Sequence, residues 1–175
     1  LAGPHSLMRI LFLVSVAVLL AAGLRAWVVE GIYVATGSME PTLHVGAHLF
    51  LDKVTYLLRD PKPGEIICFS APIEPYEEMC KRLIAVGGQT IELREKALWV
   101  DGKAVEERYV VHKRSAEKLV GDNLGPLEVP KEHVFVLGDN RDESKDSSYW
   151  TDPATKEPKP FVPLSRVRGL VRGIY

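Results

Sequence analysis

The chain has 175 residues, of which 46% are hydrophobic and 26% are charged, and its formal net charge at pH 7 is -1. This length allows one ordinary globular domain with a small additional element. Proteins that bind nucleic acids through the phosphate backbone carry a surplus of basic residues, which this chain lacks, so we expect no nucleic-acid partner.

The first predicted element is an apolar helix. Residues 8–29 carry charges only at Arg9 and Arg25, near the two ends of the segment. About 20 apolar residues suffice for an α-helix to cross the hydrocarbon core, so residues 1–29 are predicted to be a single-pass transmembrane anchor in a lipid bilayer. The Arg25 side chain is expected to extend toward one interface, and Trp27 to lie among the headgroups.

Two alternatives remain for this segment. A cleaved export signal would need a cleavage site of small residues, and Ala21-Ala22-Gly23 is a weak one. A buried core helix would normally carry polar residues along one face, and this segment has almost none. The positive charges at both ends leave the orientation of the helix open.

Beyond residue 30 the sequence is dominated by turns and β-prone runs, and helical periodicity is weak. The dipeptide Asp101-Gly102 between apolar runs is a strong hairpin signal. We therefore expect a mostly β, antiparallel domain over residues 30–175, in which the polar segment 106–130 leaves the main sheet and residues 151–160 form an exposed loop. Strands are expected at residues 32–34, 47–55, 66–69, 90–93, 97–100, 103–105, 134–137 and 167–174.

The two cysteines, Cys68 and Cys80, lie in two apolar runs separated by a proline-containing turn. If these runs pair as an antiparallel hairpin, the cysteines lie opposite each other and form a disulfide in an oxidising compartment. Two buried thiols are an equally acceptable interpretation. A zinc site is disfavoured because neither cysteine has a Cys or His neighbour at zinc-ligand spacing.

A candidate nucleophile follows the apolar segment in Thr36-Gly37-Ser38-Met39-Glu40-Pro41. Gly37 permits a sharp turn and the close approach of a substrate, while Pro41 fixes the direction in which the chain leaves the turn. Ser38 needs a neighbouring base to become nucleophilic. Taken alone, however, a Gly-Ser turn is a common structural feature.

The preferred base is Lys81, at the edge of the apolar run 83–86. Burial could lower its pKa from about 10.4 by two to three units, which would let the amine act as a base near neutral pH. An exposed strand lysine is the alternative. His44 and His48 are weaker candidates, because the turn between them argues against a shared helix and a metal pair, so they are expected to be ordinary surface or partly buried residues.

A third group of polar residues spans 138–147 and is rich in turn formers and charges. A calcium loop is excluded because glycine is missing at the sixth position of an EF-hand spacing. If this loop packs against Lys81, the Ser144 hydroxyl could accept a hydrogen bond from the lysine amine and direct it toward Ser38. Charge pairing of Arg82 with Asp139 or Asp146 would hold the register of the strand.

Taken in order, these stretches resemble the bacterial type I signal peptidases. Each stretch alone is modestly specific, whereas the ordered set is highly specific. The likeness is carried by the end of the apolar segment (Arg25 to Glu30), the nucleophile segment (Thr36 to Leu43), the lysine segment (Cys80 to Ile84), the loop from Gly138 to Ser147, and the closing residues Phe161 to Pro163 and Gly169.

The resemblance implies a membrane-bound serine endopeptidase that cleaves the N-terminal signal peptides of exported preproteins after small residues. Ser38 would attack the scissile carbonyl and Lys81 would be the general base. The Ser38 amide and the Thr36 hydroxyl would form the oxyanion hole, and Ser144 would orient Lys81.

It also implies the β-sheet catalytic core of the family, with a smaller β excursion at about 88–132 and with no metal or cofactor. The expected location is the bacterial cytoplasmic membrane, with the catalytic domain on the extracytoplasmic side. The residues expected to form the walls of the substrate pocket are Val34, Ala35, Met39, Leu43 and Cys80.

The chain departs from the family pattern at three places, the first of which is Ala85, Gly87 and Gln89, where the family often has Gly, Pro and Asp after the lysine segment. Ser148 stands where an arginine commonly follows the pair Asp146-Ser147, and residues 151–160 look inserted. Two rival functions are disfavoured. A self-cleaving repressor of the SOS type would need a DNA-binding helical domain, and a tethered protein that only captures signal sequences would not need to keep both Ser38 and Lys81.

Overall fold

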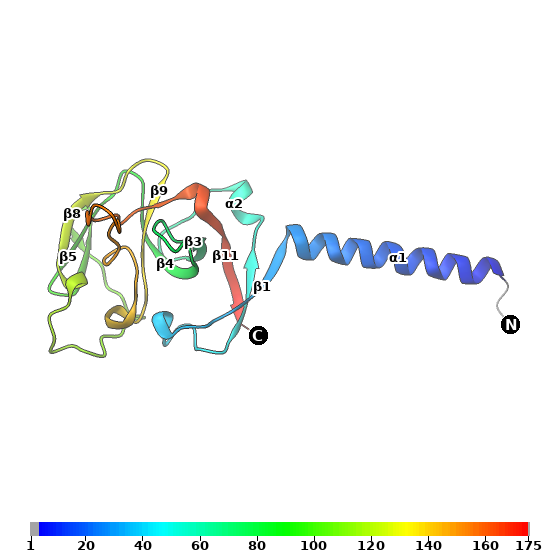
Figure 1. The fold of residues 1–175 in the computed structure, drawn as a ribbon, viewed down its shortest axis with the longest axis horizontal. Helices are drawn as coiled ribbons and strands as arrows, with labels where there is room; N and C mark the ends of the chain where they lie inside the picture. The colour runs from blue at the N-terminus through cyan, green and yellow to red at the C-terminus, as the bar shows by residue number, and fades with distance from the viewer. Residues whose placement is uncertain (1–3, 175) are drawn as a thin grey trace.

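The computed structural model describes residues 4–174, and the side chains at positions 4, 5, 24–27 and 174 lie outside that description. Helix α1 (Pro4–Trp27) projects away from the β domain as an isolated rod (Figure 1). Its 24 residues give it a length of about 36 Å, and none of the side chains of its most apolar part, Ser6–Gly23, is buried. The buried-core alternative is therefore wrong. The predictions for the Arg25 and Trp27 side chains lie outside the described residues.

The β domain consists of two antiparallel sheets. The larger sheet has seven strands in the order β1-β2-β11-β3-β4-β9-β10, and the smaller has four in the order β7-β6-β5-β8. The strands of the larger sheet are β1 (Val29–Tyr33), β2 (His48–Asp52), β3 (Ile66–Ser70), β4 (Glu78–Val86), β9 (His133–Leu137), β10 (Val162–Pro163) and β11 (Val167–Ile174). Those of the smaller sheet are β5 (Thr90–Arg94), β6 (Ala97–Val100), β7 (Lys103–Ala104) and β8 (Leu124–Glu128).

Short helical turns connect several of these strands. Helix α2 (Thr55–Leu58) follows β2, and the 3-10 turns are η1 (Gly37–Met39), η2 (Val120–Asp122), η3 (Arg141–Glu143) and η4 (Leu164–Arg166). The expected Asp101-Gly102 turn joins β6 to β7, with both residues at positive φ (51° and 73°), as a tight hairpin of this type requires.

The structure confirms the mostly β, antiparallel fold and corrects it in detail. The strand expected at residues 47–55 ends at Asp52, because the Asp52 carboxylate accepts hydrogen bonds from the Val54 and Thr55 amides (both 2.9 Å) and starts α2. Strand β8 was not predicted, because its Gly125-Pro126 pair is typical of a loop. Proline is tolerated in β8 because this strand lies at the edge of its sheet.

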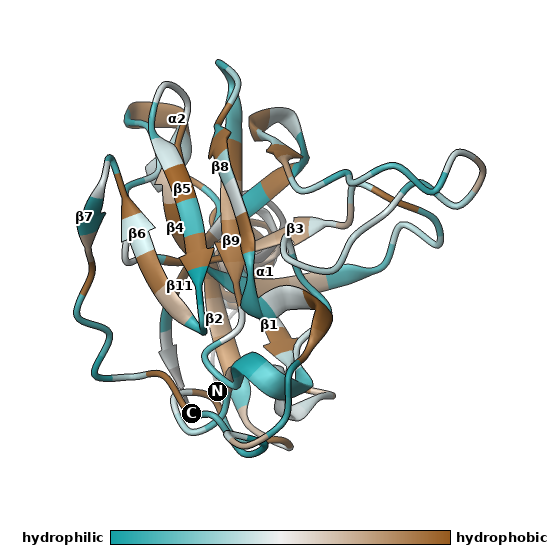
Figure 2. Cartoon of the chain, turned by 90° about the vertical axis from the view of Figure 1, so that its left-hand side faces the viewer, coloured by the Kyte–Doolittle hydropathy of each residue, from teal (hydrophilic) through white to brown (hydrophobic). Residues whose placement is uncertain are grey.

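Apolar residues concentrate along the strands, while the connecting loops are mostly hydrophilic (Figure 2). One buried cluster joins the two sheets and has members from β4, β9, β5 and β6. A second cluster packs on the larger sheet and includes Trp150. A third cluster, Met39, Leu43 and Leu49, lies directly under the Ser38 turn. The nucleophile segment is thus fixed to the sheet by the apolar residues that follow its serine.

Candidate active site

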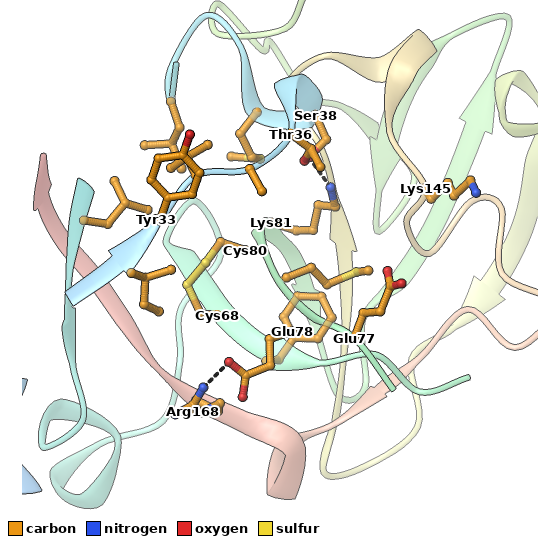
Figure 3. A pocket seen from close by; sticks show the side chains of 18 of the residues that line it. Tyr33, Thr36, Ser38, Cys68, Glu77, Glu78, Cys80, Lys81, Lys145 and Arg168 are labelled. Carbon is orange, nitrogen blue, oxygen red and sulfur yellow. Dashed lines mark hydrogen bonds and ion pairs between the residues drawn. A yellow bond between two sulfur atoms is a disulfide. The ribbon is translucent and has the colours of Figure 1, made fainter. Parts of the chain in front are cut away.

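Ser38 and Lys81 lie together although 43 residues separate them. Ser38 is on the η1 turn and Lys81 is on β4, and the Lys81 Nζ donates a hydrogen bond to the Ser38 Oγ (Figure 3). Both side chains are buried, with 8% and 3% of their surface exposed. The fold therefore brings the predicted nucleophile and the predicted base into direct contact, away from bulk water.

Burial sets the proton affinity of Lys81. Desolvation lowers the pKa of this amine from 10.5 to about 8, while the negative charges of Asp146 and Asp139 oppose the change. Desolvation prevails because a charged amine loses much of its hydration at this position. A neutral amine, which can accept a proton from a hydroxyl, is thus accessible near neutral pH.

The loop after β9 holds the Ser38 turn in place. The Asn140 amide donates to the Ser38 carbonyl oxygen (3.1 Å), and the Asn140 side-chain amide donates to the Gly37 carbonyl oxygen (2.9 Å). Gly138 lies so close that a Cβ there would approach the Ser38 carbonyl oxygen to 2.5 Å and the Ser144 Oγ to 2.3 Å. Glycine is required at this position by lack of space.

The Thr36 side chain lies beside the nucleophile. Its Oγ1 is 3.3 Å from the Ser38 Oγ, and Thr36 is exposed at the mouth of the pocket described below. This hydroxyl is within reach of a group that reacts at Ser38, as an oxyanion-hole donor must be.

A buried ion pair joins β4 to the loop after β9. The Asp139 carboxylate is 1% exposed and accepts hydrogen bonds from the Arg82 Nε (2.8 Å) and NH2 (2.6 Å). It also accepts from the Thr42 hydroxyl (2.5 Å), and the Arg82 guanidinium stacks 3.8 Å above the Tyr109 ring. Of the two carboxylates proposed as partners of Arg82, the one that binds it in the structure is therefore Asp139. The hydrogen bond from Thr42 to Asp139 is an additional contact that the sequence did not reveal.

Asp146 has a different role in the same loop. Its carboxylate accepts hydrogen bonds from the Gly138 amide (2.9 Å) and from the Ser148 amide (3.1 Å) and hydroxyl (2.7 Å). Ser148, which departs from the family pattern, thus binds the carboxylate as a neutral donor. Ser144 is 4% exposed, and its hydroxyl makes no hydrogen bond to any described residue. Its role in orienting Lys81 stays a prediction.

The smaller sheet is tied to this loop through Asp142. The Asp142 carboxylate accepts from the Lys96 Nζ (3.1 Å) and the Arg114 amide (2.6 Å), and lies 3.3 Å from the His112 Nδ1. The hairpin residue Lys96 has a φ of 71°, a conformation that is uncommon for lysine. No local motif could have identified these contacts, since they join segments 28 to 46 residues apart.

A pocket of about 440 Å³ opens beside Ser38 and Lys81 (Figure 3). All five residues predicted to form the pocket walls line it, namely Val34, Ala35, Met39, Leu43 and Cys80. The lining also includes Met79 and an ion pair between Glu78 and Arg168, which the sequence analysis missed. Arg168 reaches the pocket only because β11 pairs with β3, and this pairing has no local sequence signal.

Cys68 and Cys80 are directly opposed on β3 and β4 and form a disulfide, so the interpretation as free thiols is wrong. Within residues 4–174, no group of three or more His, Cys, Asp or Glu side chains is arranged to bind a metal. His48 begins β2 and packs its ring against Tyr33 at 5.4 Å, so it shares no helix with His44.

Comparison with known proteins gives a consistent result. The family described as "Signal peptidase, peptidase S26" matches residues 7–175. The chain is 37% identical to the probable signal peptidase I-2 of Synechocystis sp., over 87% of this chain and 66% of the relative, and 36% identical to signal peptidase I P of Bacillus subtilis subsp. natto, over 87% of both chains. It thus spans about two thirds of the length of the first of these relatives.

A solved structure is also similar. The crystal structure of a signal peptidase I from Enterococcus faecalis has a TM-score of 0.51 and 28% sequence identity, and the match covers 65% of this chain and 98% of that one. The fold, the ordered sequence segments and the match over nearly the whole chain agree, and the chain belongs to the signal peptidase family, peptidase S26.

Proposed function

We propose that the chain is a signal peptidase I, a serine endopeptidase that removes N-terminal signal peptides from exported preproteins after small residues. The observation that supports this most strongly is the buried hydrogen bond between the Lys81 amine and the Ser38 hydroxyl. A serine hydroxyl becomes an effective nucleophile when a neighbouring base takes its proton, and the lowered pKa of Lys81 suits it to that task.

In the proposed reaction the neutral Lys81 amine accepts the Ser38 proton while the Ser38 oxygen attacks the carbonyl carbon of the scissile peptide bond. The negative charge that develops on the carbonyl oxygen is stabilised by the Ser38 amide and the Thr36 hydroxyl. The Lys81 ammonium then protonates the leaving amine, which departs with the mature protein. Water, deprotonated by Lys81, hydrolyses the remaining ester between Ser38 and the signal peptide.

The residues around the dyad would keep this geometry. The Arg82–Asp139 ion pair would fix β4 against the loop that carries Ser144, and Asp146 would hold that loop together through the Gly138 amide. We assign to Ser144 the orientation of the Lys81 amine during the reaction. The pocket lined by Val34, Ala35, Met39, Leu43 and Cys80 would accept the small side chains that precede the cut.

We further propose that residues 1–29 anchor the protein in the bacterial cytoplasmic membrane by a single pass, with the catalytic domain, residues 30–175, on the extracytoplasmic side. The apolar surface of α1, in which no residue of Ser6–Gly23 is buried, supports a lipid environment. The Cys68–Cys80 disulfide supports an oxidising compartment for the β domain.

The test is cleavage of a preprotein by the full chain in detergent. We expect a mature product when alanine precedes the cut and none when that residue is replaced by phenylalanine. Ser38→Ala and Lys81→Ala should each abolish the product while circular dichroism shows an unchanged fold. Cleavage that survives either substitution would refute the proposed mechanism.

A further inference from the structure

An ion pair lies at the end of the pocket that is remote from the dyad. The Arg168 guanidinium on β11 pairs with the Glu78 carboxylate on β4, and both side chains line the pocket (Figure 3). The disulfide between Cys68 and Cys80 lies between this pair and the dyad (Figure 3). The pocket therefore runs from the reacting groups, across the disulfide, to two opposite charges.

The guanidinium of this pair is held in place by a second carboxylate. Arg168 donates from one nitrogen to both oxygens of Glu30 on β1 (3.2 and 3.0 Å), and Glu30 also pairs with Lys53 (2.8 Å). The hydrogen bond from Lys53, with the charge of Arg168, lowers the pKa of the Glu30 carboxyl, so this group stays charged at neutral pH. The Glu78 side chain is 60% exposed and the Arg168 side chain 29%. The four groups together carry two charges of each sign, so the site offers donors and acceptors without a net charge.

Strand β4 has a free edge along this part of the pocket. Its residues 78–82 pair with β3, but its pairing with β9 on the other side begins only at Arg82. No other strand in the part of the chain that the structure describes pairs with that edge over residues 78–81. A free strand edge beside a pocket binds a peptide in an extended conformation through main-chain hydrogen bonds.

The spacing along β4 assigns the ion pair to one position of such a peptide. Glu78 precedes Lys81 by three residues, which corresponds to about 10 Å along a strand. In an extended substrate cut at Ser38, the first, third and fifth residues before the cut point to the same side. The third is about 7 Å from the first and stops short of the pair, so the fifth, at about 13 Å, is the first pocket-facing side chain that reaches it.

We propose that Glu78 and Arg168 together select the fifth residue before the cut, accepting a neutral polar side chain such as glutamine and rejecting an apolar one. This inference rests on the proposed peptidase function. A side-chain amide donates a hydrogen bond to the Glu78 carboxylate and accepts one from the Arg168 guanidinium at the same time. An apolar side chain removes water from both charges and gives no hydrogen bond in return.

The pair would thereby measure where the apolar stretch of a signal peptide ends. A signal peptide carries an apolar run before a cleavage site of small residues. A cut too close to that run would place one of its apolar side chains on the two charges. The pocket beside Ser38 would thus select the residue at the cut, and the Glu78–Arg168 pair would select the distance of the cut from the apolar run.

Soluble peptides that differ only at the fifth residue before the cut test this inference. They carry alanine at the first and third positions and glutamine, leucine, lysine or alanine at the fifth, and mass spectrometry identifies the cut. We expect the unmodified chain to cleave the glutamine peptide with a kcat/KM about tenfold above that for the leucine peptide. In Glu78→Met/Arg168→Met this ratio should fall to one or below. The control Glu106→Met/Arg108→Met removes an ion pair outside the pocket, whose side chains are 76% and 86% exposed, and should keep the ratio.

Equal cleavage of the alanine peptide by all three proteins would show that the variants are folded. The variant Arg168→Met gives a second readout, because it leaves the Glu78 carboxylate without its partner, so lysine at the fifth position should become preferred over glutamine. An unmodified chain that cleaves the glutamine and leucine peptides equally would overturn the inference, as would a tenfold ratio that survives in Glu78→Met/Arg168→Met.

Binding of the same peptides separates this inference from the proposed function. Fluorescence anisotropy with Ser38→Ala, which cannot cut, should show tighter binding of the glutamine peptide than of the leucine peptide. Equal binding of the two would overturn the inference even if the unmodified chain is an active peptidase. Selective binding without any cleavage by the unmodified chain would instead refute the peptidase function and leave the selection by Glu78 and Arg168 standing.

Discussion

Replacing the buried amine of Lys81 should make the protein inactive and more stable at the same time. The Lys81→Met variant keeps a side chain of similar length and removes the charge that burial disfavours. Because folding lowers the pKa of this amine from 10.5 to about 8, the unfolded chain binds more protons between these two pH values. The free energy of unfolding of the unmodified protein should therefore rise with pH across this window, and below pH 8 the full cost of the buried charge is present.

The size of the effect follows from the same two values. A tenfold change in a protonation equilibrium corresponds to about 1.4 kcal/mol, so the buried ammonium costs about 3 kcal/mol at pH 7. Lys81→Met should raise the free energy of unfolding by up to that amount at pH 7 and lose the advantage toward pH 10.5. The cleavage rate of the unmodified protein should rise about tenfold from pH 7 to pH 9, because the neutral fraction of an amine with this pKa rises by that factor.

Two assays check these expectations. Urea denaturation of the two proteins, followed by tryptophan fluorescence in the same detergent between pH 7 and pH 10.5, gives the stability difference. Peptide cleavage between pH 6 and pH 10 gives kcat/KM. A destabilised Lys81→Met protein at pH 7, or a rate that does not change through pH 8, would refute the argument that burial makes Lys81 a base.

Three further predictions concern the surroundings of the dyad. Thr36→Val should lower kcat by a factor of about 100 to 1,000, as loss of an oxyanion donor does, and Thr36→Ser should restore it; equal activity of the two variants would show that the hydroxyl is not used. Arg82→Met leaves the Asp139 carboxylate buried and unpaired, so urea denaturation should show a loss of about 3–5 kcal/mol, and a loss below about 1 kcal/mol would contradict the importance of the pair. Joint replacement of Cys68 and Cys80 by alanine removes a cross-link between residues 12 apart in sequence and should lower the free energy of unfolding by about 3 kcal/mol. Identical urea unfolding curves for the oxidised and the reduced native protein would contradict this.

Much of the site could be predicted because its parts are carried by short segments with strong local chemistry. Ser38 stands on a glycine turn, and Lys81 precedes an apolar run. The opposed positions of Cys68 and Cys80 follow from pairing two apolar runs across a proline-containing turn, although only the structure decides between a disulfide and free thiols.

The remaining features depend on contacts between distant segments. Thr42 binds Asp139 across 97 residues, and Arg168 enters the pocket only through the pairing of β11 with β3. The end of β2 was also missed, because the hydrogen bonds from the Val54 and Thr55 amides to the Asp52 carboxylate override the β propensity of Val54. Periodicity cannot reveal such contacts, since each depends on the register of the assembled sheets.

The central claim is that burial lowers the pKa of the Lys81 amine to about 8, so that a neutral amine is available beside the Ser38 hydroxyl near neutral pH. Its most direct test is an NMR titration of the full chain labelled with 13C at lysine Cε, in which the resonance missing from Lys81→Met is followed from pH 6 to pH 11. We predict that this resonance titrates near pH 8. A midpoint at 10.5 or above would show that the ammonium is not disfavoured by burial and would contradict the assignment of Lys81 as the general base.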